Sequence, residues 1–247
     1  MCCMLTKYEL ERYDRQIRIS GFGKEGQEKL KEARVLVAGA GGLGFPISAY
    51  LTAAGIGKLK IVDKDVVELS NLNRQLLHWN KDVGRRKVES AREKLIQINP
   101  RVEVDAIGET ITETNVLNLV SDVDAIIDAM DNFPTRLVLN KAALKKKIPF
   151  FHGAVRGFMG QATTIVPGET ACLRCIFPEA PPAEKFPILG SIAGLIGAIQ
   201  ATEVVKYFTG IGGLLKNKLL IYDGQYTSFD IMELKANPNC PDCKIGR

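Results

Sequence analysis

The sequence has no long hydrophobic run. Its most apolar late stretch, GSIAGLIGAI, starts at Gly190 and is much shorter than the ~20 residues a membrane-spanning helix needs. The N-terminus, MCCMLTKYELERYDR, carries charged residues too early for a secretory signal peptide. We therefore expect no membrane association and a cytoplasmic location.

Basic clusters, repeats and linkers are also scarce. The net charge is +5, but the basic residues are scattered apart from Lys145 to Lys147, a run typical of a solvated helix end. No nucleic-acid partner is expected. No internal repeat, low-complexity tract or long linker divides the 247 residues, of which 46% are hydrophobic and 25% charged. Residues 1–247 are thus expected to form one domain.

Histidine is rare. The two histidines, His78 and His152, each stand alone beside apolar residues. An isolated histidine in such a setting is more often packed in the structure than used in catalysis. We expect neither to be catalytic.

A glycine-rich turn is the clearest local signal that is present. In residues 33–65 a short β-branched run, ARVLVAG, precedes a longer segment with helical spacing, so strand, tight turn and helix follow in order. Gly39, Gly41 and Gly44 have the spacing at which backbone approaches a phosphate. Asp63 ends the next strand, about where the dinucleotide fingerprint places an acid for a ribose hydroxyl. On these residues alone, an NAD site is an open alternative.

The order of the later segments predicts an α/β fold. RVEVDAIG, DVDAIIDAMD and IPFFHGAV are expected to continue a parallel series of strands, with helices between them, and QATTIVPG and NKLLIYDGQYTSFDIMEL to add later strands. The predicted fold is a Rossmann-like, doubly wound α/β domain with a mixed central sheet and C-terminal antiparallel strands. About residues 30–165 would form the nucleotide-binding half, and residues 166–247 a carrier-binding and zinc half.

Four of the six cysteines form two identical C-x-x-C spacings. Cys172 and Cys175 make the first pair, and Cys240 and Cys243 the second, within NPNCPDCK at the C-terminus. Two such knuckles can together supply four thiolates to a tetrahedral Zn²⁺, whereas a cytoplasmic chain has little use for structural disulfides. Two redox dithiols, or four ordinary thiols, are the alternatives. A full thiolate set leaves no open position for water, so the zinc is expected to be structural and to pin the C-terminal tail.

Several longer motifs carry a family resemblance. ERYDRQIRISGFGKEGQEKLKEARVLVAGAGGLG, VDKDVVELSNLNRQLLH, DVGRRKVESA, DAMDNFPTR, GQATTIVPG, CLRCIFPEAPP and GAIQATEVVKYFTG occur in family order over about residues 8–243. Together they resemble the ThiF/MoeB/HesA family of ubiquitin-activating-enzyme-like adenylyltransferases. The resemblance implies adenylation, with ATP and Mg²⁺, of the C-terminal Gly-Gly carboxylate of a small ubiquitin-like carrier protein, and release of pyrophosphate.

The resemblance also assigns roles to residues. Arg74 and Lys87 match positions that bind the triphosphate, Asp131 matches a Mg²⁺-associated aspartate, and Arg15 matches an arginine contributed across a homodimer interface to the partner's ATP. These four are the expected catalytic residues, with Asp128 a less favoured metal partner. The expected ATP-binding residues are Gly39, Gly41, Gly42, Gly44, Asp63, Asp65, Asn71, Arg74, Gln75, Lys87, Asp131 and Asn132. The role of Asp65 is left open.

The chemistry favours this set independently of the family. A carboxylate that attacks the α-phosphorus of ATP meets growing negative charge on the phosphates, so several cations and a metal are needed in one site. A hydride-transferring NAD enzyme has no use for such a clamp. An inactive scaffold for a ubiquitin-like partner, the third possibility, would not need to keep it.

No cysteine lies between Cys175 and Cys240. Family members that form a thioester or acyl disulfide with their carrier place a cysteine in the segment that here contains Phe186, Pro187 and Ile188. We therefore expect an enzyme that stops at the acyl-adenylate, with Cys2 and Cys3 in a tail unsuited to catalysis. The chain ends at Arg247 without a rhodanese-like domain. A persulfide-bearing sulfurtransferase, or a separate acceptor, would then react with the adenylate.

Overall fold

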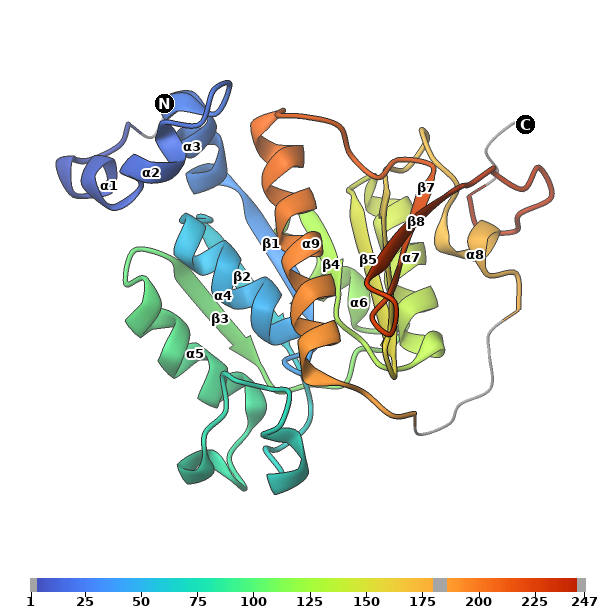
Figure 1. Cartoon of the computed structure of the whole chain (residues 1–247), viewed down its shortest axis with the longest axis horizontal. Helices are drawn as coiled ribbons and strands as arrows, with labels where there is room; N and C mark the ends of the chain where they lie inside the picture. The colour runs from blue at the N-terminus through green and yellow to red at the C-terminus, as the bar shows by residue number, and fades with distance from the viewer. Residues whose placement is uncertain (1–3, 180–185, 244–247) are drawn as a thin grey trace.

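The computed structural model describes residues 4–179 and 186–243. The described residues form one eight-stranded sheet with the order β3-β2-β1-β4-β5-β6-β7-β8 (Figure 1). The strands are β1 (Arg34–Ala38), β2 (Lys58–Val62), β3 (Glu103–Ile107), β4 (Ala125–Asp128), β5 (Phe150–Arg156), β6 (Met159–Ile165), β7 (Lys218–Asp223) and β8 (Ser228–Glu233). From β3 to β5 all neighbours pair in parallel, and from β5 to β8 all pair antiparallel.

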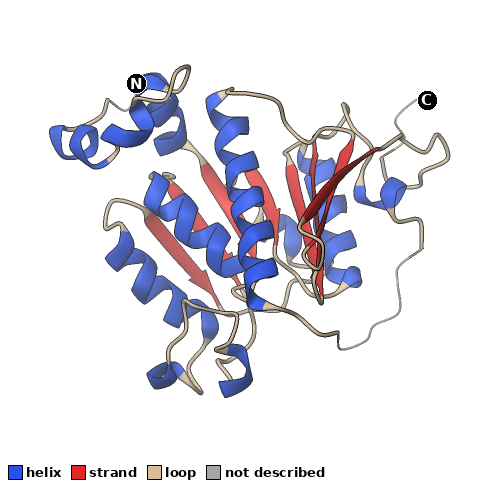
Figure 2. Cartoon of the chain, viewed as in Figure 1, coloured by secondary structure: helices blue, strands red, loops and turns tan. Residues whose placement is uncertain are grey.

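Helices cover both faces of the parallel part of the sheet (Figure 2). The longer ones are α3 (Gly23–Glu32), α4 (Gly44–Ala54), α5 (Lys87–Ile98), α7 (Phe133–Lys146) and α9 (Gly190–Thr209). Short helices are α1 (Lys7–Arg12), α2 (Asp14–Ile17), α6 (Val116–Leu119) and α8 (Leu173–Ile176), and the 3-10 turns are η1 (Leu69–Asn71) and η2 (Asn80–Asp82).

The alternation of strand side chains divides the core in two. Val35 and Val37 of β1 face the cluster that contains α4, α5 and α9, whereas Leu36 and Ala38 face the cluster built on α6 and α7. All four side chains are fully buried. Strands buried on both faces read as continuous apolar runs, which is why β1 is apolar after the exposed Arg34 and β4 is apolar up to Asp128.

The sheet reverses its winding between β1 and β4. Strand β2 follows β1 on one side, but β4 pairs with the other side of β1. Doubly wound sheets open a crevice at such a switch point, beyond the carboxyl ends of the strands. The fold therefore places the glycine turn after β1 and the acidic turn after β4 at one crevice.

The predicted fold class is confirmed. The parallel series and the antiparallel C-terminal strands run in the expected order, and one sheet passes through both expected halves of the chain. The tail beyond β8 returns to α8, where the two cysteine pairs meet. No helix among the described residues combines the length and apolarity required to cross a membrane.

Candidate active site

The glycine turn after β1 is shaped by two glycines that tolerate no side chain. Gly39 has φ +111°, and a Cβ there would lie 2.6 Å from the carbonyl oxygen of Ala129. A Cβ on Gly44 would lie 2.0 Å from the carbonyl oxygen of Gly39. Both contacts are far inside van der Waals distance, so larger residues would displace the turn. The turn leads directly into α4, whose N-terminus can attract phosphate.

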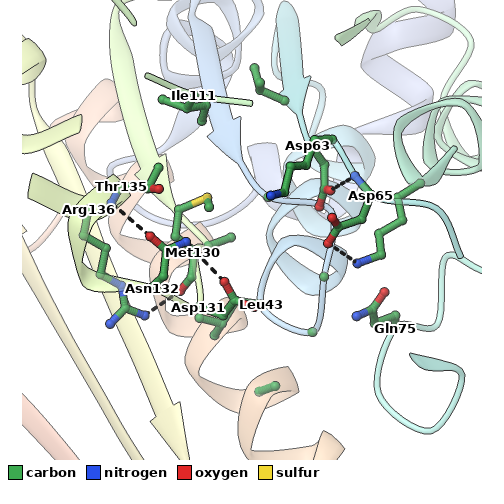
Figure 3. A pocket seen from close by; sticks show the side chains of 18 of the residues that line it. Leu43, Asp63, Asp65, Gln75, Ile111, Met130, Asp131, Asn132, Thr135 and Arg136 are labelled. Atoms are coloured by element: carbon green, nitrogen blue, oxygen red, sulfur yellow. Dashed lines mark hydrogen bonds and ion pairs between the residues drawn. The ribbon is translucent and has the colours of Figure 1, made fainter. Parts of the chain in front are cut away.

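A cavity of about 370 Å³ lies at the crevice between β1 and β4. Figure 3 shows Asp63, Asp65 and Gln75 on one side of it and the segment around Met130 and Asp131 on the other. Ten of the twelve expected ATP-binding residues line it: Gly39, Gly41, Gly42, Asp63, Asp65, Arg74, Gln75, Lys87, Asp131 and Asn132. Its volume is in the range of small-molecule sites.

Two expected residues lie outside this lining. Gly44 packs tightly under the turn, as its contact with Gly39 requires. Asn71 is buried, and its Oδ1 accepts a hydrogen bond of 3.0 Å from the backbone N–H of Glu68, which holds the turn η1. Their roles in binding ATP stay predictions, whereas their roles in shaping the two loops follow from these contacts.

Lys87 is held in place by Asp65. Its Nζ lies 3.1 Å from Asp65 Oδ2, and its backbone N–H donates to the Asp65 carbonyl at 3.0 Å. The lysine side chain is only 8% exposed, while that of Asp65 is 51% exposed. Asp65 thus orients a nearly buried ammonium toward the cavity, a role that the sequence left open.

Arg74 and Gln75 come from the loop between β2 and α5. Arg74 Nη1 donates to the Ser70 carbonyl at 2.9 Å and to Asn73 Oδ1 at 3.0 Å. Gln75 is buried, and its Oε1 accepts no hydrogen bond from the described residues. A buried amide without a partner costs free energy unless a ligand or water completes it. The loop therefore contributes a cation to the cavity lining and holds a buried amide oxygen without a partner.

Asp63 shapes the glycine turn itself. Its Oδ2 accepts from the backbone N–H of Ala40, and its Oδ1 from that of Asp65, both at 2.8 Å. A carboxylate oxygen accepts more than one hydrogen bond. Asp63 therefore keeps acceptor capacity toward the cavity, as a ribose site requires.

Asn132, not Asp131, caps helix α7. Asn132 Oδ1 accepts from the backbone N–H of Thr135 at 3.0 Å, the usual N-cap arrangement. Asp131 remains exposed, with one long contact of 3.4 Å from Asn132 Nδ2. The carboxylate that could have served merely as a cap is available to a metal or ligand instead.

Arg15 does not line this cavity. It lies in α2, beside α3, which ends at Glu32, one residue before β1 begins (Figure 1). The neighbouring Gln16 donates to the Ala54 carbonyl at the end of α4, at 2.8 Å. This is the amino edge of the sheet, opposite the cavity, so within one protomer Arg15 cannot reach it.

Other lining residues carried no clear sequence signal. Glu109, Thr110 and Ile111 follow β3, and Val155, Phe186, Ile188 and Ala193 give an apolar wall between β5 and α9. Further lining residues are Leu43, Val62, Lys64, Ala129, Met130, Thr135 and Arg136. The segment after β3 could have been anticipated, because parallel strands all end at the same edge. The apolar wall depends on how the chain crosses back to α9, which no local motif encodes.

Both histidines are buried and engaged in hydrogen bonds, consistent with the expectation that they pack. His78 Nε2 lies 3.0 Å from the Ala40 carbonyl and its Nδ1 2.9 Å from Ser90 Oγ. His152 Nδ1 lies 2.7 Å from Asp128 Oδ2. Burial lowers the pKa of each imidazole, which keeps both rings neutral at physiological pH.

The four paired cysteines meet in one cluster. Their ligand atoms all lie within 4.8 Å of one another, and the Sγ–Sγ distances for Cys172–Cys175, Cys172–Cys240 and Cys175–Cys243 are 3.9, 3.6 and 3.4 Å. Neighbouring sulfurs of a tetrahedron with Zn–S bonds of about 2.3 Å are separated by about 3.8 Å. The cluster could therefore hold a zinc ion. Burial is the largest cause that raises the pKa of the Cys175 thiol to about 11.

The ThiF family profile matches residues 13–242 of the chain. The chain belongs to the ThiF family. Among curated proteins it is 44% identical over 252 residues to the SAMP-activating enzyme E1 of Haloferax volcanii, covering 100% of this chain and 93% of that protein. It is 41% identical over 249 residues to the sulfur carrier protein adenylyltransferase of Thermus thermophilus, covering 96% and 92%.

Two further comparisons extend the family relation. The chain is 43% identical to the adenylyltransferase and sulfurtransferase MOCS3 of Culex quinquefasciatus, covering 97% of this chain but 56% of that protein. Among solved structures, E. coli MccB with MccA-N7isoAsn superimposes with a TM-score of 0.85 at 25% identity, covering 95% of this chain and 74% of that one. The α/β architecture of this ThiF-family protein is thus the one seen in MccB.

Proposed function

We propose that this ThiF-family protein adenylates the C-terminal glycine of a small ubiquitin-like carrier protein. One observation carries the proposal: Arg74 from the β2–α5 loop, Lys87 from the start of α5 and Asp131 from the turn after β4 line the same cavity as the glycine turn. Relatives that share at least 41% identity over nearly the whole chain are named as a SAMP-activating enzyme and a sulfur carrier adenylyltransferase. On this support the chain is an adenylyltransferase that uses ATP.

The cavity can stabilise the reaction electrostatically. A carboxylate oxygen of the carrier attacks the α-phosphorus of ATP, a P–O bond to that glycine forms, and the bond to pyrophosphate breaks. Negative charge grows on the phosphate oxygens as pyrophosphate departs. Lys87 is nearly buried, so its charge acts in a poorly screened environment, and Arg74 can donate to phosphate oxygens on the same side.

Asp131 fits a magnesium site. Its exposed carboxylate stands at the cavity, and Mg²⁺ in nucleotide sites is usually held by one or two carboxylates together with phosphate oxygens and water. When bound, Mg²⁺ would neutralise phosphate charge. In this proposal Asp131 orients the ion, Asp63 accepts from the ribose, and Gln75 donates to the nucleotide through its Nε2.

The experiment that tests the function is carrier-dependent exchange of labelled pyrophosphate into ATP. Candidate carriers ending in Gly-Gly are added one at a time to purified protein, and exchange is expected with at least one of them. A carrier shortened by its last glycine is the matched control and should give none. Quenching or enhancement of nicotinamide fluorescence on titration, without exchange, would favour an NAD-dependent oxidoreductase. Carrier binding without exchange would indicate an inactive scaffold.

We also propose that no enzyme–carrier thioester forms. The sequence has no cysteine between Cys175 and Cys240, and the side chains at the crossover are Phe186, Pro187 and Ile188. Cys2 and Cys3 lie outside the described residues. The acyl-adenylate is a mixed anhydride that an external sulfurtransferase or another acceptor can attack directly, so a covalent enzyme intermediate is not required.

Non-reducing gels and intact-mass spectrometry test this absence. After incubation with ATP, Mg²⁺ and a Gly-Gly carrier, we expect acyl-adenylate and no thiol-sensitive adduct between enzyme and carrier. A stoichiometric adduct that disappears in a Cys2→Ser/Cys3→Ser variant would contradict the proposal and make the N-terminal cysteines catalytic.

The protein is further proposed to work as a homodimer in which Arg15 completes the partner's site. The support is that Arg15 lies at the sheet edge opposite the cavity of its own protomer. Its guanidinium suits phosphate oxygens because it offers several donors in a fixed geometry.

Mixed dimers test this arrangement. A heterodimer of an Arg15→Ala protomer and an Asp131→Asn protomer contains one site with both residues intact if Arg15 acts across the interface. We expect exchange to return to as much as half the wild-type rate, although each homodimer is inactive. A heterodimer as inactive as its parents would show that Arg15 does not act in trans.

The cysteine cluster is proposed to bind one structural Zn²⁺. The support is the four-thiol donor set with near-tetrahedral spacing. Four free thiols also suit a reducing compartment such as the cytoplasm. The ion would join the loop after β6 to the C-terminal tail, and full thiolate coordination would leave it without a position for substrate.

A further inference from the structure

The turn that carries Asp131 is fixed by a buried charged pair. Asp128 ends β4 and is fully buried, and Arg136, one turn into α7, is only 6% exposed. Arg136 Nε lies 3.3 Å from Asp128 Oδ2. The side chain of Asp131, by contrast, is exposed, so its position depends on the backbone that precedes it.

The pair grips the peptide groups on both sides of Met130. Asp128 Oδ1 accepts from the Met130 N–H at 3.0 Å, and Arg136 Nη2 donates to the Met130 carbonyl at 2.5 Å. That carbonyl belongs to the peptide bond that joins Met130 to Asp131. In Figure 3 Arg136 is seen beside Met130 and Asp131 at the same wall of the cavity. The Asp128–Arg136 pair therefore holds the backbone directly before Asp131, the residue expected to bind the metal.

Residues of several other elements hold the Asp128 side of this pair in place. His152 of β5 lies 2.7 Å from Asp128 Oδ2, and Gln161 Nε2 lies 3.2 Å from the opposite ring nitrogen of His152. With a neutral ring, Nδ1–H donates to Asp128 and Nε2 accepts from Gln161. Gln200 of α9 donates to the carbonyls of Asp128 and Phe151, at 2.8 and 3.0 Å. Strand β5 and helix α9 thus contact Asp128 at the end of β4 and fix its position.

Stability alone gives little reason for such a pair. Burying two charges costs desolvation energy that their attraction only roughly repays, and apolar residues of similar volume often serve as well. Apolar residues cannot, however, accept from the Met130 N–H and donate to its carbonyl. A group that must meet a metal and a phosphate needs positioning to within about 0.5 Å.

We propose that Asp128 and Arg136 are positioning residues that hold Asp131 for Mg²⁺·ATP. The inference rests on the proposed function of the cavity. Neither residue is assigned a contact with substrate: Arg136 acts through the Met130 carbonyl, and Asp128 through the Met130 N–H and through Arg136.

Calorimetric titration with ATP, in EDTA and in Mg²⁺, measures the factor by which Mg²⁺ strengthens binding. Arg136→Met is expected to reduce this factor about tenfold, as loss of a partner behind a metal ligand commonly does. Asp131→Ala should reduce it more, and the double variant should match Asp131→Ala, because Arg136 has nothing left to position. Lys141→Met, on the exposed side of the same helix, is the matched control and should equal wild type.

Thermal unfolding checks that each variant is folded. If Arg136→Met does not fold, Arg136→Lys keeps the positive charge but loses the planar donor group, and it should shift the factor in the same direction. The inference would be overturned if Mg²⁺ strengthened ATP binding by the same factor in wild type and in the folded Arg136 variant. It would also be overturned if the Arg136 substitution reduced this factor as much in Asp131→Ala as it does in wild type. Absent pyrophosphate exchange with intact Mg²⁺-dependent ATP binding would count against the proposed function alone.

Discussion

Replacing Lys87 by methionine is expected to lower carrier-dependent pyrophosphate exchange by roughly a hundredfold or more, and Arg74→Met to have a similar effect. Removing one fixed donor aimed at developing negative charge costs about 3 to 4 kcal/mol in comparable sites. The effect at Lys87 should be the larger of the two, because its side chain is 8% exposed and solvent screens it poorly. Asp131→Asn should abolish exchange more completely, since it removes the proposed metal ligand.

Exchange kinetics at saturating carrier, with melting curves for each variant, check this result. Lys81→Met is the matched control, because Lys81 comes from the same loop but its side chain is 59% exposed and lies outside the cavity lining. It should leave exchange unchanged. Wild-type rates in Lys87→Met, Arg74→Met and Asp131→Asn would show that the triphosphate binds elsewhere.

Loss of the cysteine cluster is expected to release the metal and destabilise the fold. Cys172 and Cys240 are 0% and 1% exposed and belong to the same core cluster as α6 and α7. In Cys240→Ser/Cys243→Ser the tail would lose its anchor. A loss of about 3 to 4 kcal/mol would lower Tm by on the order of 10 °C for a chain of this size. Metal analysis should show the zinc content falling from about one ion per protomer to near zero.

The comparison variant is Cys2→Ser/Cys3→Ser, which removes the same number of thiols outside the cluster and should keep both zinc and Tm. ATP binding measured at low temperature should survive in the folded Cys240→Ser/Cys243→Ser protein, because the cysteines do not line the nucleotide cavity. Unchanged zinc content in the Cys240→Ser/Cys243→Ser protein would show that these cysteines do not bind the zinc.

Local sequence was enough to predict the elements, and together with the family resemblance it named ten of the residues that line the cavity. The β-branched run before Gly39 and the helical spacing after Gly44 depend only on side chains a few positions apart, and so does the double C-x-x-C spacing. Arg74, Lys87 and Asp131 were found because motifs occur in family order, and the structure brings all three to one cavity. Such motifs indicate which residue types a site contains but not how those residues are arranged in space.

Tertiary structure alone decided how these residues meet. Strand order places β4 beside β1, so Asp131 faces the glycine turn, and only that arrangement reveals that a Cβ on Gly39 would collide with Ala129. The same packing gives Asn132 the cap and Asp65 the task of orienting Lys87, and it sends Arg15 to the opposite edge. Local pattern cannot encode these outcomes, because each depends on contacts between segments far apart in the chain.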